Sequence, residues 1–342
     1  MTVAVFLASL LGFMSFGMPI AFALILTGAV LMWYLEFWDV QLLAQNLLAG
    51  ADSFPLLAVP FFILAGELMN AGGLSRRIID LARSLVGHVP GGLGYVAIAA
   101  SVLLASMSGS AIADTAALAT LLLPMMRRQN YPDGSSAGLI ASGGIIAPII
   151  PPSMPMVIYG VTTNTSISKL FLAGIVPGLM MATALVMVWR WVARTKQLSV
   201  AEKTTWPERR HALASSAWAL MMPVIIIGGL RMGFFTPTEA AVVAAVYALL
   251  VATLVYRELN LAGIYRVLVD ASRTTGVVMF LCGAATAASY MITLADLPNE
   301  LAKSIGPLLS EPMLFMAVVC LFLLAVGMVM DLTPTILILA PV

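Results

Sequence analysis

Apolar segments long enough to cross a bilayer recur along the whole chain, and this feature constrains the fold more than any other. A spanning helix needs about 20 predominantly apolar residues. A soluble domain of 342 residues would need more charge on its surface than the 10% of charged residues found here. The sequence therefore predicts an all-α integral membrane protein. The expected apolar segments are residues 3–35, 54–71, 92–126, 136–160, 168–193, 213–232, 237–256, 274–295 and 312–342.

Charge placement predicts how these segments are oriented. Lys and Arg collect on the cytoplasmic side, so we expect the polar linker 194–211 and the N-terminus to be cytoplasmic. Segments 92–126 and 312–342 are too long for one straight crossing and carry small, polar or proline residues in their middles. We expect each to enter the membrane and turn back as a helical hairpin. The amphipathic residues 73–87 are predicted to form an arm lying along the membrane interface.

An internal repeat relates the two long segments. Asp114 and Asp331 each precede an apolar half-helix, and Pro124 and Pro341 follow them at the same spacing. The charge rule gives the two halves opposite orientations, and inverted repeats with broken helices are typical of secondary transporters. We expect a first repeat at 1–193, with scaffold helices 3–35 and 54–71, then a cytoplasmic linker at 194–211 and a second repeat at 212–342.

The second repeat is expected to be incomplete. Segments 136–160 and 168–193 have no counterpart after the second hairpin. The second repeat of this sequence ends within the hairpin 312–342. We therefore expect the natural protein to continue with a further C-terminal part.

Two interruptions of helical sequence could carry chemistry. Residues 106–110 combine Ser and Gly, and residues 143–155 combine two glycines with four prolines, which no continuous helix accommodates. Such breaks leave carbonyl groups that lipid cannot satisfy, and we expect the two breaks to face each other. Carbonyl and hydroxyl oxygens with Asp114 nearby suit sodium. Tight packing of small residues between helices is the structural alternative.

These features resemble the large membrane subunit of tripartite ATP-independent periplasmic (TRAP) transporters, the DctM-like family, over the entire chain. Within the family, the chain is most similar to members that handle diketogulonate-type sugar acids. The resemblance rests on the strings PFFILAGELMNAGG (60–73), SGSAIADT (108–115), ASGGIIAPIIPPS (141–153), FTPTEA (235–240) and GMVMDLTP (327–334).

The resemblance implies an inner-membrane carrier of a small organic anion, such as a C4-dicarboxylate or sugar acid, driven by a sodium gradient. It implies a periplasmic binding protein and a small four-helix membrane subunit as partners, with no organic cofactor, no nucleic acid and no enzymatic activity. The fold would be that of the ion-transporter superfamily with an elevator motion, framed by arms at 73–87 and about 259–272.

The resemblance also implies the site residues. One sodium would be held by Ser106, Ser108, Gly109, Ser110, Gly143, Gly144 and Pro148, with Asp114 in support, and half of another by Gly327, Asp331, Thr333 and Pro334. The candidate substrate-binding residues are Ser110, Thr115, Pro151, Pro152 and Ser153.

Two other classes of membrane protein remain as alternatives. Broken helices also line channels, and saturable sodium-dependent uptake that needs a binding protein would separate a carrier from a channel. An intramembrane aspartyl protease could use Asp114 and Asp331, but no Gly-x-Gly-Asp string precedes Asp331, and the repeat already explains this pair.

Overall fold

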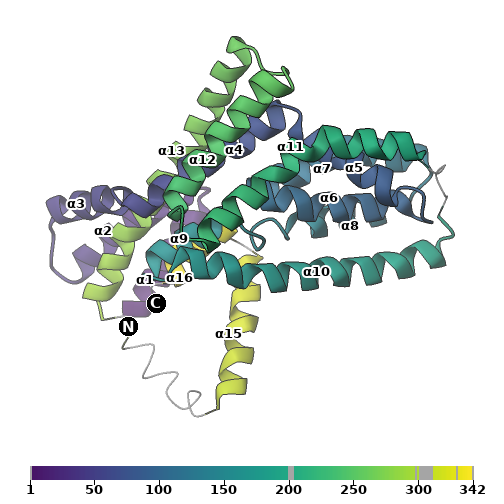
Figure 1. Ribbon diagram of the computed structural model, residues 1–342. Helices are drawn as coiled ribbons and strands as arrows, with labels where there is room; N and C mark the ends of the chain where they lie inside the picture. Colours follow the sequence, from purple (N-terminus) through teal and green to yellow (C-terminus); the bar gives the residue numbers. More distant parts are fainter. Residues whose placement is uncertain (1, 199–203, 297–298, 300–310, 329, 341–342) are drawn as a thin grey trace. The chain divides into compact units, whose positions relative to one another are not determined.

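The computed structural model describes residues 2–198, 204–296, 299, 311–328 and 330–340, and within these residues it contains helices and no strand (Figure 1). The elements in chain order are α1 (Thr2–Ser15), α2 (Ile20–Tyr34), α3 (Val40–Ala51), η1 (Phe54–Leu57), α4 (Ala58–Ala71), α5 (Leu74–Val86), α6 (Gly92–Ser108), α7 (Ala111–Arg128), α8 (Asp133–Gly144), α9 (Met154–Thr162), α10 (Ile167–Thr195), α11 (Trp206–Arg231), α12 (Pro237–Leu250), η2 (Val251–Val255), α13 (Leu261–Leu294), α15 (Pro312–Gly327) and α16 (Leu332–Leu339).

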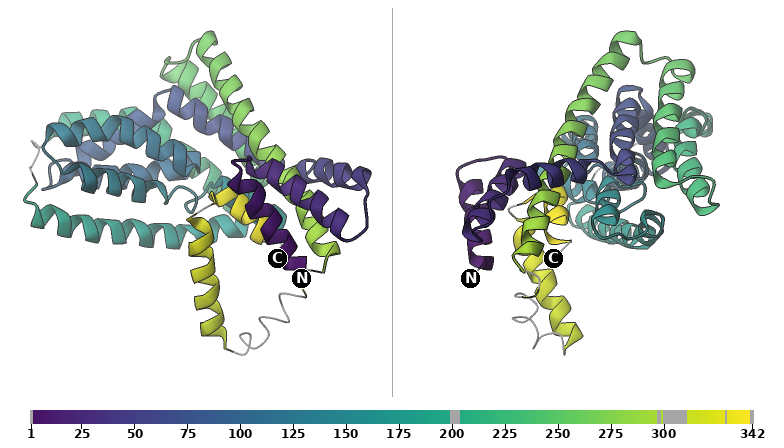
Figure 2. Two further views of the ribbon diagram at one scale, coloured as in Figure 1. Left: turned by 180° about the vertical axis from the view of Figure 1, so that it is seen from behind. Right: turned by 90° about the vertical axis from the view of Figure 1, so that its left-hand side faces the viewer.

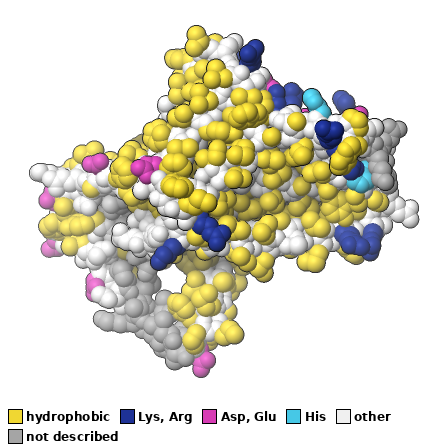
Figure 3. Space-filling model, viewed as in Figure 1, with side chains coloured by type: hydrophobic (Ala, Val, Ile, Leu, Met, Phe, Trp, Pro, Cys, Tyr) yellow, Lys and Arg dark blue, Asp and Glu magenta, His cyan; other side chains and the backbone are white. Residues whose placement is uncertain are grey.

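Five helical segments of the described part are long and apolar enough to cross a membrane. Hydrophobic side chains cover most of the face seen in Figure 3, and Lys, Arg and His side chains gather at the end where α10 finishes and α11 begins. These observations confirm the predicted all-α membrane protein. The five segments are Phe54–Ala71, Ile167–Thr195, Trp206–Arg231, Pro237–Val255 and Leu261–Leu294.

Local capping chemistry explains where two of these helices start. The backbone N–H of Thr205 donates to the Glu208 carboxylate at 2.8 Å at the start of α11. The same arrangement joins Thr236 and Glu239 at the start of α12, again at 2.8 Å. Each capping box satisfies donors that the first helical turn leaves without partners.

Several predicted boundaries are corrected at the N-terminal end. The predicted helix 3–35 is two helices, because Gly17 adopts a φ of +77° and Pro19 precedes α2. The sequence prediction also missed α3, a short helix whose first turn is capped by the side chain of Asp39. Both errors arise from counting apolar residues, which registers neither a tight turn nor a helix too short to span.

Two further boundaries are corrected in the second half. Helix α11 starts at Trp206, so much of the predicted linker 194–211 is helical. Helix α13 runs without interruption through the predicted second arm at 259–272 and the following span. The separate second arm is therefore wrong, because nothing between these two segments breaks the helix.

The chain divides into two compact units that do not follow the predicted repeat boundary. The first consists of Met1–Leu56, Val161–Asn164 and Thr275–Val342, and the second of Leu57–Gly160 and Thr165–Thr274. The inverted repeat therefore stays a prediction.

Close backbone approach organises the first unit. A Cβ atom at Gly50 would collide with Thr286 of α13, and one at Gly283 would lie 2.6 Å from the Leu47 carbonyl oxygen. Phe22 and Phe280 add an aromatic contact with ring centroids 5.2 Å apart. Helices α2 and α3 thus pack on α13 where small side chains leave room.

The second unit contains both sequence features expected to carry chemistry. Helix α4 packs along α12, and α5 packs against α6 and α11. Helices α6, α7 and α8 pack on one another, with α10 against α6 and α8. The blue and teal helices of this unit stay side by side in both turned views (Figure 2).

Candidate functional site

The predicted hairpin tip is a sharp turn between α6 and α7. Gly109 has a φ of +61°, a conformation that favours glycine. Ser110 follows as the N-cap of α7, and its side-chain oxygen accepts a hydrogen bond from the backbone N–H of Ala113 at 3.3 Å. The turn confirms that residues 92–126 form two helices, and it places polar groups at the tip.

Buried polar side chains lie close to this turn. Asp114, one turn into α7, is 1% exposed, and Ser106 at the end of α6 is also buried. The Ser106 hydroxyl donates to the Leu103 carbonyl oxygen at 2.7 Å, which leaves its oxygen lone pairs for another partner. The side chain of Ser108, another predicted sodium ligand, lies outside the described residues.

The predicted break in segment 136–160 separates α8 from α9. Its carbonyl groups are less free than the sequence suggested. The Gly143 and Gly144 carbonyl oxygens accept backbone hydrogen bonds from Ile146 at 3.1 Å and Ala147 at 3.2 Å. The fully buried Ser153 hydroxyl donates to the Pro148 carbonyl oxygen at 2.5 Å. The prediction of unpaired carbonyls at these positions is therefore wrong, although each carbonyl retains a second lone pair.

The tip and the break meet in space. A Cβ atom at Gly109 would lie 2.6 Å from the Pro152 carbonyl oxygen and 3.0 Å from the Ser153 Cα. A Cβ atom at Gly144 would collide with the Thr115 hydroxyl. The expectation that the break faces the hairpin is thereby confirmed. These contacts bring together polar groups from α7, the end of α8 and the segment before α9.

Predicted ligands from the second long segment lie in the other compact unit. A break separates α15 from α16, as expected. Asp331 is the N-cap of α16 but makes no side-chain cap hydrogen bond, and its carbonyl oxygen accepts from the Thr335 hydroxyl at 2.8 Å. Asp331 and Gly327 are exposed, Thr333 is partly buried and Pro334 is buried; Pro341 lies outside the described residues.

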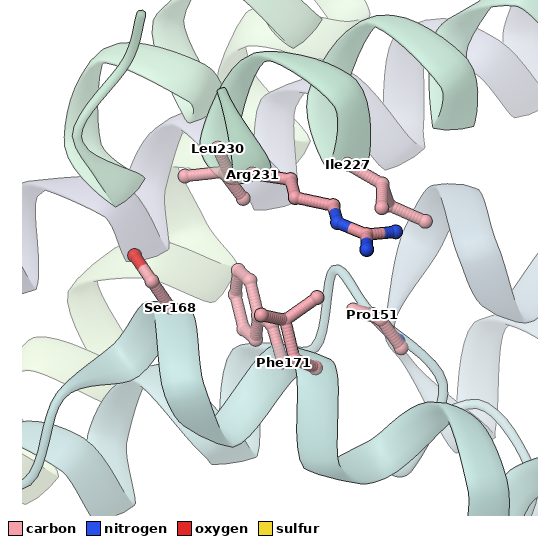
Figure 4. A pocket seen from close by; sticks show the side chains of 7 residues that line it. Pro151, Ser168, Phe171, Ile227, Leu230 and Arg231 are labelled. Atoms are coloured by element: carbon pink, nitrogen blue, oxygen red, sulfur yellow. The ribbon is translucent and has the colours of Figure 1, made fainter. Parts of the chain in front are cut away.

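A small cavity beside the break is lined by Pro151, a predicted substrate-binding residue, and by residues that the sequence prediction missed (Figure 4). It has a volume of about 20 Å³, room for about one water molecule. The Arg231 guanidinium lies between Ile227 and Pro151. An organic acid does not fit this cavity. Arg231 could not be singled out from the sequence, because it lies near the break only in the folded structure. The lining residues are Pro151, Ser168, Phe171, Leu172, Ile227, Leu230 and Arg231.

The donor set at the tip and break has a distinct chemical character. Among the described residues, no group of three or more His, Cys, Asp or Glu side chains could hold a metal ion. The side-chain and backbone oxygens of the tip and the break belong instead to hydroxyl groups and carbonyl groups, and the first turn of α7 adds the buried carboxylate of Asp114. Neutral oxygens with a single carboxylate fit a hard monovalent cation better than zinc or another transition metal.

The DctM component of the tripartite ATP-independent periplasmic transporters matches residues 7–342 of this sequence. The chain belongs to this family. As a DctM-family protein it is a membrane permease and not an enzyme.

Curated relatives include permeases for different acids. The chain is 57% identical to the 2,3-diketo-L-gulonate TRAP transporter large permease protein YiaN of Escherichia coli K12, covering 100% of this chain and 80% of the relative. It is 40% identical to the sialic acid permease SiaM of Vibrio cholerae, covering 97% and 78%. It is 39% identical to the C4-dicarboxylate permease DctM of Pseudomonas aeruginosa, covering 93% and 74%.

Proposed function

We propose that this DctM-family permease imports a small organic anion across the bacterial inner membrane in symport with sodium. A periplasmic binding protein delivers the substrate, a small four-helix membrane subunit braces the permease, and the N-terminus is cytoplasmic. Support for an acidic substrate comes from the relatives, whose names specify diketogulonate, sialic acid and C4-dicarboxylates. A sugar acid is the favoured class, because the diketogulonate permease is 57% identical to this chain.

The contact between the hairpin tip and the helix break carries the proposed ion site. Gly109 lies against Pro152 and Ser153, while Asp114 is buried in the first turn of the following helix. A buried carboxylate beside hydroxyl and carbonyl oxygens strengthens binding of a cation at membrane depth. Hydroxyl groups of Ser106 and Ser110 together with break carbonyls are the proposed sodium ligands, and Ser110, Thr115 and residues 151–153 are the proposed substrate contacts.

The proposed motion is an elevator. The hairpin α6–α7 and the broken helix α8–α9 would carry the ion and the substrate together, because their polar groups lie against one another. Ion and substrate sites on one moving body would couple the sodium gradient to uptake without a separate signal between distant sites.

Uptake measured against sodium concentration tests the proposed ion site. In the permease assembled with its partner proteins, we expect Asp114→Asn to raise the sodium half-saturation by at least about tenfold, because it removes the buried negative charge beside the proposed ligands. Asp133→Asn is the matched control, since Asp133 pairs with Arg127 on an exposed surface. An unchanged sodium half-saturation in Asp114→Asn would place the ion site elsewhere.

A further inference from the structure

At the corner between α4 and α5, the backbone lies very close to η2 and the segment that follows it. A Cβ atom at Gly72 would collide with Ala252 of η2. Gly73 has a φ of +73°, and a Cβ atom there would collide with the Glu258 carboxylate. Two successive glycines therefore let a segment distant in the sequence lie directly against the start of the interfacial arm α5.

Arg77, in the first turn of the arm, contacts this distant segment through its guanidinium group. The Arg77 Nη1 atom lies 2.6 Å from Oε1 of Glu258 and donates to the Gly73 carbonyl oxygen at 3.0 Å. The Arg77 guanidinium carbon stands 3.7 Å from the ring centroid of Tyr256. A planar guanidinium can make an ion pair and stack on a ring at the same time, whereas an ammonium group cannot reproduce both contacts.

Helix α11 completes the arrangement. The Tyr256 hydroxyl donates to the Ser215 carbonyl oxygen at 2.6 Å. The buried Ser216 hydroxyl, which also donates to the Ala212 carbonyl oxygen of its own helix, lies 3.1 Å from the Arg77 carbonyl oxygen. The start of α5 is thus tied both to α11 and to the segment that follows η2.

The start of α6, which follows the arm, is anchored separately. The buried Trp189 indole of α10 donates from Nε1 to the Gly91 carbonyl oxygen at 2.8 Å. Trp189 also packs against the backbone of Gly94 at the start of α6. The start of the arm and the start of α6 are therefore both held, and α5 packs against α6, the first helix of the hairpin.

The Arg77–Glu258 pair is poorly placed to contribute much to folding stability. The side chains are 22% and 38% exposed, and both line an open cavity. Partly exposed ion pairs stabilise proteins little, because solvent screens them. A contact of this kind between residues so distant in the sequence is better suited to setting the position of a helix than to holding the fold together.

We propose that Arg77 is a positioning residue for transport, whose pairing with Glu258 and stacking on Tyr256 keep the start of α5 in place while the adjacent hairpin moves. This role rests on the proposed elevator motion. Loss of the contact would let the arm shift with the hairpin and slow the transport step, while the ion and substrate contacts at the tip would be unchanged.

Charge reversal tests this role in the permease assembled with its partner proteins. We expect Arg77→Glu and Glu258→Arg each to lower the maximal uptake rate about fivefold or more, with KM values for substrate and sodium within about twofold of the original. The double reversal restores the ion pair and should recover at least about half of the rate. Arg77→Lys keeps the charge but loses the stacked fork and should lower the rate about twofold. Arg76→Glu, at an exposed neighbouring position, is the matched control and should transport normally.

The outcomes separate the possibilities. Single reversals with the original maximal rate, or a double reversal as slow as the single ones, would overturn the role of Arg77. A raised KM without a rate loss would also overturn it, because it indicates a binding contact. If a charge reversal prevents folding, the test rests on Arg77→Lys: a maximal rate about twofold lower supports the role, and an unchanged rate overturns it. If uptake is independent of sodium in every variant but the rates follow the expected order, the sodium coupling fails and the positioning role stands.

Discussion

The two broken segments share a sequence pattern but differ sharply in their surroundings. Asp114 of the first hairpin is 1% exposed, and Leu118 and Leu122 of the same helix are fully buried. Asp331 before α16 is exposed, and no residue of α15 is buried. A helix break therefore accompanies the Asp and the apolar half-helix in both places, but within the described residues only the first Asp is buried.

The difference teaches that burial depends on covering elements and not on the repeated pattern. Helices α6 and α7 pack against each other and against α8, and the segment before α9 lies on the hairpin tip. Within the described residues, α15 packs only sparsely, and its exposed face carries large apolar side chains. A break in a helix creates unsatisfied groups, but only a neighbouring element can turn them into a site.

The largest expected difference between the two segments comes from removing core methyl groups. Leu122→Ala should lower the free energy of unfolding by about 2–5 kcal/mol, because Leu122 is fully buried and the change leaves a cavity. Leu321→Ala should stay within about 0.5 kcal/mol, since Leu321 is 70% exposed. Denaturant unfolding in mixed micelles measures both. Equal losses would mean that α15 is as well covered as α7 in the assembled protein.

A smaller difference is expected at two glycines. Gly144→Ala should destabilise the protein by about 1–3 kcal/mol, because the added methyl group meets Thr115 and lies 3.2 Å from the Ala111 carbonyl oxygen. Gly327→Ala meets open space and should be neutral or stabilising by less than about 1 kcal/mol. Thermal melting in detergent, combined with uptake, reads out both changes. Normal stability and transport in Gly144→Ala would contradict the close contact between α8 and α7.

The smallest difference concerns two hydroxyl groups. Ser153→Ala should cost about 1 kcal/mol, because the fully buried hydroxyl donates to Pro148 across the break. Thr335→Ala should cost less than about 0.5 kcal/mol, since that hydroxyl bonds back within its own helical turn. Unfolding measurements under identical conditions compare the pair. A larger loss at Thr335 would reverse the ranking of the two breaks.

Much of the helical layout could be predicted because its signals are local. The length of apolar runs, the glycine and serine at the first tip, and the three prolines between α8 and α9 act on the backbone within a few residues. The amphipathic pattern of residues 73–87 likewise predicted a helix, and these residues form α5 at Leu74–Val86. Predictions failed where a short signal interrupts or extends a helix, as at Gly17 and through the continuous α13.

The sequence by itself determined that this protein is an all-α membrane protein with interrupted helices, because hydropathy and turn chemistry depend on neighbouring residues in the chain. The tertiary structure alone decided which interruption becomes a buried polar site, which carbonyl groups are already paired, and that Arg77 meets Glu258 and Tyr256. Those features require close approach of residues far apart in the sequence. Such contacts depend on how whole helices pack, which no local pattern specifies.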